Sequence, residues 1–323
     1  MRARERRQRK LRRRLTALAA LLVVVVVVVV VAVAASGNSP STATGGHREA
    51  LATRRTHRRQ ATRGERPRRG ESTAAVLGPG TGKPGTAAVP VLMYHVIAAP
   101  PPDAPFPGLY VLPQEFAAQM QALKAAGWHP VTLDQLQANW TRGARLPTGK
   151  PIVITFDNGY HSQYAAALPV LKRLGWVADE NLQLSGLPAS QGGLSGSEVR
   201  GLVDAGWELD TQGISHADLI TLDASQLRYQ IATARQTLRR RYGVPVNWFC
   251  YPSGHYDDTV VAAVRAAGFS GSTTVIPGWA RPSSDPYRLP RLRVLAGTSP
   301  AALLEQIASA HDSSPPPDSY GGT

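Results

Sequence analysis

Short apolar runs recur from residue 89 onward, and each is followed by a stretch with helical periodicity. We expect strands at residues 89–96, 152–156, 176–184, 207–211, 247–251, 270–275 and 292–295. We expect helices at residues 114–127, 165–174, 197–205, 224–242 and 258–267. Continuous apolar runs are typical of parallel strands that are covered on both faces. The alternation therefore predicts an α/β barrel domain of parallel strands with covering helices.

The N-terminal part of the chain has a different pattern. Residues 15–35 form an uncharged run of 21 residues, long enough for a helix that spans a bilayer. The nine basic residues in the segment 1–14 predict that this segment is cytoplasmic and that the domain is exported. Small residues at 32–35 leave open a cleaved signal peptide and hence a secreted protein. However, the run is longer than the apolar region of most signal peptides, which favours an uncleaved transmembrane anchor.

Composition sets the remaining boundaries. Residues 36–88 are rich in Arg, Gly, Thr, Ala and Pro and poor in large apolar residues, which predicts a disordered basic linker. Its basic cluster, residues 54–69, is open to two interpretations: a solvated spacer, or a contact with an anionic wall polymer or lipid. We expect the folded domain at residues 89–312 and a flexible tail, rich in Pro, Ser and Gly, at residues 313–323.

The position of the charge argues against nucleic-acid binding. The chain has a formal net charge of +14, but residues 1–71 hold 18 Lys and Arg against 4 Asp and Glu, while residues 72–323 hold 18 of each kind. The folded part is therefore neutral, and no basic surface for nucleic acid is expected on it. The single cysteine, Cys250, lies in an apolar run and is expected to be a small buried side chain.

Polar residues gather directly after four of the expected strands. The carboxyl ends of parallel strands meet at one mouth of a barrel, so we expect these side chains to converge on one site. Asn158 is unusual there, because a metal site would favour a carboxylate. The residues are His95, Asp157, Asn158, His161, Asp210, Gln212, His216, Tyr251, Ser253 and His255.

Several of these segments, taken in order, resemble the polysaccharide deacetylases of the NodB-homology type, carbohydrate esterase family four. The segments are residues 90–95, 155–160, 206–209, 215–219, 249–254 and 289–294. The resemblance extends from about Pro90 to Ile307 and implies a distorted (β/α) barrel of about seven parallel strands. It also implies hydrolysis of N-acetyl groups in chitin, peptidoglycan or exopolysaccharide. In this family a divalent metal, often zinc, is held by one Asp and two His and activates a water molecule.

The motif is only partly kept in this chain. Asp157 matches the catalytic base, and His216 matches the second histidine ligand. Asn158 stands where the ligand Asp is expected, and Gln212 stands where the first ligand His is expected. Neutral amides are poor zinc ligands, so the resemblance implies zinc but the residues put it in doubt. Other residues could complete a rearranged site, namely His95, His161, Asp210, Tyr251 and His255.

Three functions follow as expectations. The first is an exported, membrane-anchored protein that hydrolyses the N-acetyl groups of a cell-wall or extracellular glycan. The second is a catalytically inactive relative that binds glycan or a cell-envelope partner. The third is a metal-independent hydrolase that uses Asp157 and His216 directly. Trp279 is the expected aromatic for sugar stacking, whereas Trp207 and Trp248 are expected in the core.

Overall fold

Seven parallel strands lie side by side in the order β7-β6-β5-β4-β3-β1-β9. Two further short strands, β2 (Trp128–Pro130) and the antiparallel β8 (Trp279–Ala280), pair with β3 and β1. The expected distorted barrel of about seven parallel strands is confirmed. The seven are β1 (Val89–Tyr94), β3 (Lys150–Asn158), β4 (Asp179–Leu182), β5 (Glu208–Thr211), β6 (Trp248–Cys250), β7 (Gly271–Thr273) and β9 (Leu292–Arg293).

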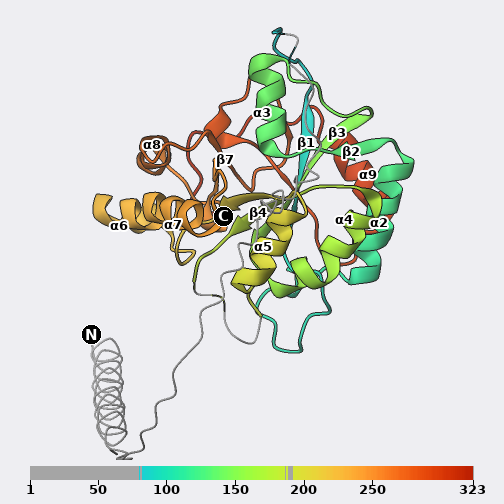
Figure 1. The fold of residues 1–323 in the computed structure, drawn as a ribbon, viewed down its shortest axis with the longest axis horizontal. Helices are drawn as coiled ribbons and strands as arrows, with labels where there is room; N and C mark the ends of the chain where they lie inside the picture. Colours follow the sequence, from blue (N-terminus) through green and yellow to red (C-terminus); the bar gives the residue numbers. More distant parts are fainter. Residues whose placement is uncertain (1–79, 81, 186, 188–191, 323) are drawn as a thin grey trace, which may run out of the picture. The chain divides into compact units, whose positions relative to one another are not determined.

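Helices connect successive strands and cover the sheet, as parallel pairing requires. In the computed structural model, α2, α4 and α9 group on one side of the strands and α6, α7 and α8 on the other (Figure 1). Together α6, a π-helical turn (Tyr229–Thr233) and α7 cover the expected helix 224–242. The helices are α2 (Pro113–Ala125), α3 (Leu133–Arg142), α4 (Leu168–Leu174), α5 (Gly196–Asp204), α6 (Ala224–Arg228), α7 (Ala234–Tyr242), α8 (Asp258–Ala266) and α9 (Pro300–Ser309).

The structure describes residue 80, residues 82–185, residue 187 and residues 192–322, which all lie in the compact unit Pro67–Thr323. The expected cytoplasmic segment 1–14, the span 15–35 and the linker up to residue 79 lie outside the described residues. No helix in the described part is long and apolar enough to cross a membrane.

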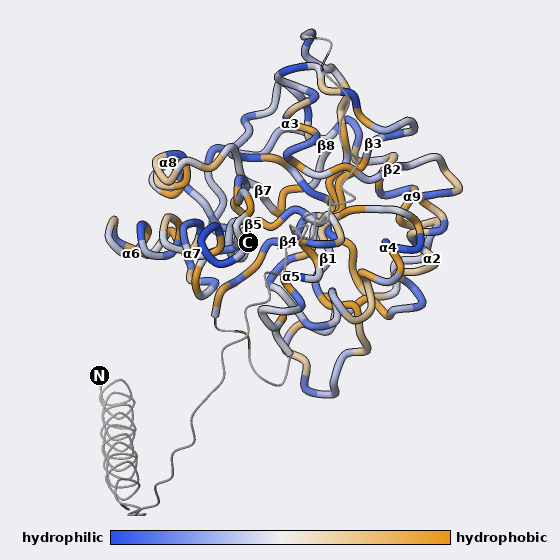
Figure 2. The backbone as a smooth tube through the Cα atoms, viewed as in Figure 1, coloured by the Kyte–Doolittle hydropathy of each residue, from blue (hydrophilic) through white to orange (hydrophobic). Residues whose placement is uncertain are grey.

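Aromatic rings fill the centre of the core. Phe156 stacks on Trp207 with ring centroids 5.0 Å apart and on Tyr94 at 5.7 Å. The hydrophobic positions concentrate on the strands and on the inner faces of the helices (Figure 2). Trp207, Trp248 and Cys250 are buried, which confirms their expected place in the core.

Two helices that were not expected nevertheless have start signals in the sequence. At α3, the Thr132 hydroxyl accepts a hydrogen bond from the Gln135 amide, while the Gln135 side chain accepts one from the Thr132 amide. At α9, Ser299 caps the helix through the Ala302 amide and a proline follows directly. Such capping boxes and N-terminal prolines mark helix starts. Strands β2 and β8 have only three and two residues, and no apolar run announces them.

The C-terminal tail packs on the domain, which differs from the expectation of a loose segment. Tyr320 and Tyr256 exchange two backbone hydrogen bonds of 2.8 Å. The Tyr256 hydroxyl also donates to the Pro317 carbonyl at 2.8 Å. Paired backbone of this kind explains how a segment rich in Pro, Ser and Gly can be fixed without an apolar run of its own.

Candidate functional site

A cavity of about 600 Å³ opens at the carboxyl ends of the parallel strands. It brings together seven of the residues that the sequence placed at strand ends. The cavity is also lined by the aromatic Phe106, by the amide Gln183 and by the charged Arg293. The seven expected residues are His95, Asp157, Asn158, Gln212, His216, Tyr251 and Ser253.

Backbone strain is concentrated at this cavity. Among the described residues, three non-glycine residues have a positive φ: Asn158 at 77°, His216 at 55° and Ser253 at 55°. All three line the cavity. Left-handed backbone is unfavourable for residues with a side chain and tends to cluster at functional sites. Gly159, which directly follows Asn158, also has a positive φ, and a Cβ atom there would collide with the Leu182 side chain.

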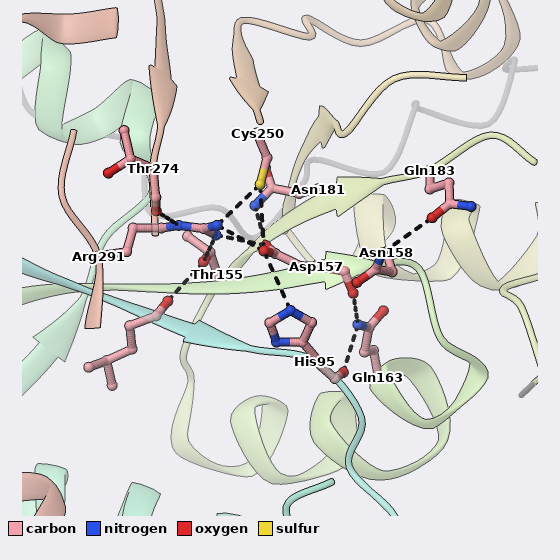
Figure 3. Close-up of polar contacts among 11 residues, drawn as sticks. His95, Thr155, Asp157, Asn158, Gln163, Asn181, Gln183, Cys250, Thr274 and Arg291 are labelled. Carbon is pink, nitrogen blue, oxygen red and sulfur yellow. Dashed lines mark hydrogen bonds and ion pairs between the residues drawn. The ribbon is translucent and has the colours of Figure 1, made fainter. Parts of the chain in front are cut away.

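Asp157 is held in a buried ion pair with Arg291 (Figure 3). The two guanidinium nitrogens donate to the two carboxylate oxygens at 2.7 and 2.8 Å. The Asn181 side chain adds a third hydrogen bond at 2.9 Å, and the Cys250 thiol lies 3.5 Å away. Asp157 is 1% exposed and Arg291 is fully buried. The carboxylate is therefore fixed in direction by a bidentate contact that only arginine can make.

The ion pair with Arg291 sets the charge state of Asp157. Burial alone would raise the pKa of Asp157, but the charge of Arg291 and its hydrogen bonds outweigh burial and lower the pKa to about 2. Asp157 is consequently ionised at neutral pH. Burial raises the pKa of the neighbouring Cys250 thiol to about 12. Cys250 is therefore a protonated, inert thiol, which agrees with the expectation that it is no nucleophile.

Arg291 reaches Asp157 because its segment runs between two strands. The Leu289 amide donates to the Ser272 carbonyl at 3.0 Å, and the Val294 amide donates to the Met93 carbonyl at 3.0 Å. In the structure, the Arg291 guanidinium donates to the Cys250 sulfur at 3.1 Å. A cation within the apolar run 289–295 is the signal that could have identified it.

Two neutral histidines border the cavity. The His95 Nε2 atom lies 3.9 Å from the Asp157 carboxylate. Burial lowers the pKa of His95 to about 4 against the opposing effect of Asp157, and its buried Nδ1 atom has no hydrogen-bond partner among the described residues. Burial also lowers the pKa of His216. Both imidazoles are therefore neutral at neutral pH and can accept a proton.

Side-chain amides make up much of the remaining floor. The Asn158 amide nitrogen donates to the Gln183 side-chain oxygen at 3.2 Å, and Gln183 in turn donates to the Ser185 carbonyl. Gln212 follows β5 and is 3% exposed. Its Oε1 atom is buried and has no hydrogen-bond partner within the described chain. The floor thus carries one amide that is fixed and one that is unsatisfied.

Three residues that were considered as possible site neighbours lie elsewhere. The His161 side chain is 56% exposed and pairs with Glu198 at 2.6 Å. Asp210 accepts hydrogen bonds from the backbone amides of Asn247 and Trp248 at the start of β6. His255 bonds Asp218 at 3.0 Å. None of the three lines the cavity, because each side chain is hydrogen-bonded or paired to these local partners instead.

The exposed aromatic at the cavity is Phe106 rather than Trp279. The Trp279 indole donates to the Ile307 carbonyl at 2.8 Å and packs against Trp128. Phe106 is 68% exposed and lines the cavity. The expectation for Trp279 failed because its ring packs against α9 and β2, which were themselves not expected. An exposed aromatic beside a polar cavity is suited to stacking on a sugar ring.

The donors at the cavity do not fit a zinc centre. No group of three His, Cys, Asp or Glu side chains in the described part of the chain is placed to hold a metal ion. Both oxygens of Asp157 are already bound by Arg291, so only the imidazoles of His95 and His216 remain beside the neutral amides. Zinc sites in proteins are built from thiolates, imidazoles and carboxylates. Tyr251 offers no help, since its hydroxyl donates to the Tyr287 carbonyl.

Comparison with known proteins gives a consistent picture. A family model described as polysaccharide deacetylase matches residues 145–272. YxkH of Bacillus subtilis (strain 168), which is assigned as a polysaccharide deacetylase, is 28% identical over 69% of this chain and 77% of its own length. The solved structure of BC0361, a polysaccharide deacetylase from Bacillus cereus, is similar with a TM-score of 0.60, 27% identity, and coverage of 68% of this chain and 69% of that one. The Streptococcus pyogenes deacetylase PplD, solved with acetate, has a TM-score of 0.63 at 24% identity and shares the fold over 69% of this chain and 99% of its own.

Proposed function

We infer the function of this chain from the family to which it belongs, the polysaccharide deacetylases. We propose that it hydrolyses N-acetyl groups of an acetylated amino-sugar polymer of the cell wall or extracellular matrix. The observation that carries this proposal is the position of Asp157, which is ionised, rigidly held and part of the cavity lining beside two neutral histidines. Phe106 at the same cavity gives a sugar ring a surface to stack on.

The residues support a simple proton balance. A water molecule adds to the acetyl carbonyl, and its proton passes to Asp157 or to a neutral histidine. The same proton then goes to the sugar nitrogen as the amide C–N bond breaks, which yields a free amine and acetic acid, and the acid then releases its proton to solvent as acetate. Arg291 holds the Asp157 carboxylate in place and favours its charged form before the water adds. Because Arg291 also lowers the basicity of Asp157, the site as built is suited to slow rather than rapid turnover.

Release of acetate tests this proposal directly. The full chain is incubated with acetylated amino-sugar polymers of known linkage, and free acetate is measured. Asp157→Asn should lower the rate at least about 100-fold, the usual contribution of a general base. Asp204→Asn, at an exposed position at the end of α5 and not among the residues that line the cavity, is the matched control and should leave the rate unchanged. Equal rates for the two variants would exclude Asp157 as the base.

A second function is favoured by one specific observation, the set of donors at the cavity. With Asn158 and Gln212 at two of the three expected ligand positions and His216 at the third, the cavity would bind acetylated glycan, or a cell-envelope partner, without cleaving it. Retention of acetylated polymer by the full chain, with no acetate released over hours at high protein concentration, would establish this function over the first. Zinc-dependent acetate release by the natural chain would contradict it.

We also propose that the domain acts outside the cytoplasm on a single membrane anchor. The support is the apolar run 15–35 with nine basic residues before it. In cells that produce the chain, membrane fractionation should place it in the membrane, and external protease should remove the domain while the cell stays intact. N-terminal sequencing separates the anchored form, which keeps residue 15, from a cleaved and secreted form.

A further inference from the structure

We propose that the side-chain amide of Gln212 binds the acetamido group of the glycan directly, at the position where the resemblance implies a metal ligand. The proposal rests on the proposed ligand, an acetylated amino sugar, but it applies whether or not that ligand is then cleaved. It makes recognition by this chain independent of metal. Gln212 is then a residue that determines specificity for acetylated sugars.

The first observation is an unsatisfied amide in a fixed place. Gln212 lines the cavity, is 3% exposed, and its Oε1 atom has no partner within the described chain. The backbone that carries this side chain is rigid, because two backbone N–H groups are hydrogen-bonded. The backbone N–H of Gln212 donates to the Leu182 carbonyl at 3.0 Å, and the backbone N–H of Gly213 donates to the Thr211 hydroxyl at 3.1 Å. A buried polar group without a partner carries a free-energy cost. A ligand that enters the cavity can remove this cost.

The second observation is chemical complementarity. A glutamine amide offers two N–H donors and an oxygen acceptor, while an acetamido group offers one carbonyl acceptor and one N–H donor. The two groups can therefore pair through two hydrogen bonds, with the sugar carbonyl accepting from Gln212 and the sugar N–H donating to it. During hydrolysis the same N–H donor would face the developing oxyanion, a role that side-chain amides fill in known hydrolases.

The third observation is the charge around Gln212. Asp157 is compensated by Arg291 at 2.7 and 2.8 Å. Asn158 is neutral and is held by Gln183 at 3.2 Å. The additional charged group at the cavity, Arg293, is a cation. A site with this balance favours a neutral acetamido group and disfavours the ammonium group that remains after deacetylation.

The experiment measures binding, separately from cleavage. The full chain is titrated by calorimetry with a tetramer of N-acetylglucosamine, and then with the same tetramer after complete de-N-acetylation. We expect the acetylated tetramer to bind at least tenfold more tightly. Its dissociation constant should stay within twofold in excess EDTA and in added zinc.

Variants then assign the effect to Gln212. Gln212→Leu removes donor and acceptor and should weaken binding of the acetylated tetramer at least tenfold. Gln212→Glu keeps the length and one acceptor but loses the N–H donor, and should do the same. Gln121→Leu, at an exposed position on α2, is the matched control and should bind like the natural chain. Thermal melting followed by circular dichroism checks that each variant is folded; if Gln212→Leu is not, Gln212→Glu carries the test.

Several results would overturn the inference. They are loss of binding in EDTA with recovery in zinc, unchanged binding by both folded Gln212 variants, equal or tighter binding of the de-N-acetylated tetramer, and no binding of the acetylated tetramer at all. The proposed hydrolysis fails on a different measurement, the absence of released acetate. Metal-independent, Gln212-dependent binding without acetate would therefore support this inference while rejecting the hydrolysis.

Discussion

The two ends of the same parallel strands treat buried carboxyl groups in opposite ways. At the carboxyl end, Asp157 faces the Arg291 guanidinium, and its pKa falls to about 2. At the amino end lies a group that we call the carboxyl cluster, which consists of Asp134, Asp179, Glu208 and Asp210. There burial raises the pKa values of Asp179, Glu208 and Asp210 well above the usual range, and the neighbouring carboxyls raise them further.

The difference comes from the partners and not from burial. Asp157 receives hydrogen bonds from a cation, whereas the carboxyl cluster receives them from neutral donors. The Leu133 amide donates to Asp179 at 3.1 Å, and the Trp248 amide donates to Asp210 at 2.8 Å. A backbone amide satisfies an oxygen atom but does not cancel a charge. At the carboxyl end of the strands Asp157 therefore keeps its negative charge, whereas at the amino end the carboxyl cluster favours the protonated form.

Removing the cation should have the largest effect on this contrast. Arg291→Met leaves Asp157 buried without its partner, and we expect a loss of about 3–5 kcal/mol in the free energy of unfolding. Urea denaturation of the variant and the natural chain measures it. Arg240→Met, at an exposed position on α7, should change stability by less than about 0.5 kcal/mol. A loss below 1 kcal/mol at Arg291 would mean that the pair is not buried as described.

Restoring ligand types at the carboxyl end should have the next largest effect. The double variant Asn158→Asp with Gln212→His puts an Asp and a second His beside His216 at the three expected ligand positions. We expect zinc affinity to increase about 100-fold, or about 2.8 kcal/mol, with one zinc bound per chain by elemental analysis. Adding His216→Ala should abolish it. If the double variant takes up no zinc, these positions do not match the ligands of the family.

The carboxyl cluster should make the fold less stable as pH rises. Groups with raised pKa values in the folded state hold protons that the unfolded chain has released, so their stabilisation is full below pH 4 and is lost as pH increases through the folded pKa. Asp210→Asn keeps an acceptor for Trp248 but cannot ionise. Between pH 5 and pH 7 its loss of stability should be smaller than that of the natural chain. Parallel curves for the two proteins in urea titrations would show that Asp210 does not ionise in this range.

Asp157 provides the opposite sign for comparison. Its pKa of about 2 lies below the unfolded value near 4, so its contribution is present above pH 4 and is lost as pH falls through about 2. Arg291→Met should remove this acid-side loss, because the pair no longer favours the ionised form.

The smallest effect is expected at a carboxyl outside both groups. Glu180 on β4 is 1% exposed, and neither of its carboxyl oxygens has a hydrogen-bond partner within the described chain. Glu180→Met keeps an unbranched side chain of similar length and removes the unsatisfied atoms, so we expect a gain of about 1 kcal/mol. Glu305→Met on the exposed face of α9 is the control for a general effect of the substitution. Destabilisation by Glu180→Met would indicate that Glu180 has a polar partner after all.

The site shows where prediction from sequence stops. Asp157, Asn158, Gln212 and His216 were brought together as expected, because each follows an apolar strand and parallel strands end at one mouth. His161 also follows this strand closely, but its imidazole pairs with the carboxylate of Glu198 on α5. Position along the chain sets the end of the sheet at which a residue lies. The group that its side chain contacts there depends on helices and segments from other parts of the chain that pack against this end.

The sequence by itself determined the parallel α/β architecture, the order of most of its strands and helices, and seven of the residues at the mouth, because hydrophobic periodicity and strand ends are local properties. Only the tertiary structure decided that Arg291, which is 134 residues away in sequence, holds Asp157. Only the structure left Gln212 unsatisfied and placed four carboxyls in one cluster. Charge states in a core depend on distances of about 3 Å between polar atoms that come from different segments, and no local pattern encodes such distances.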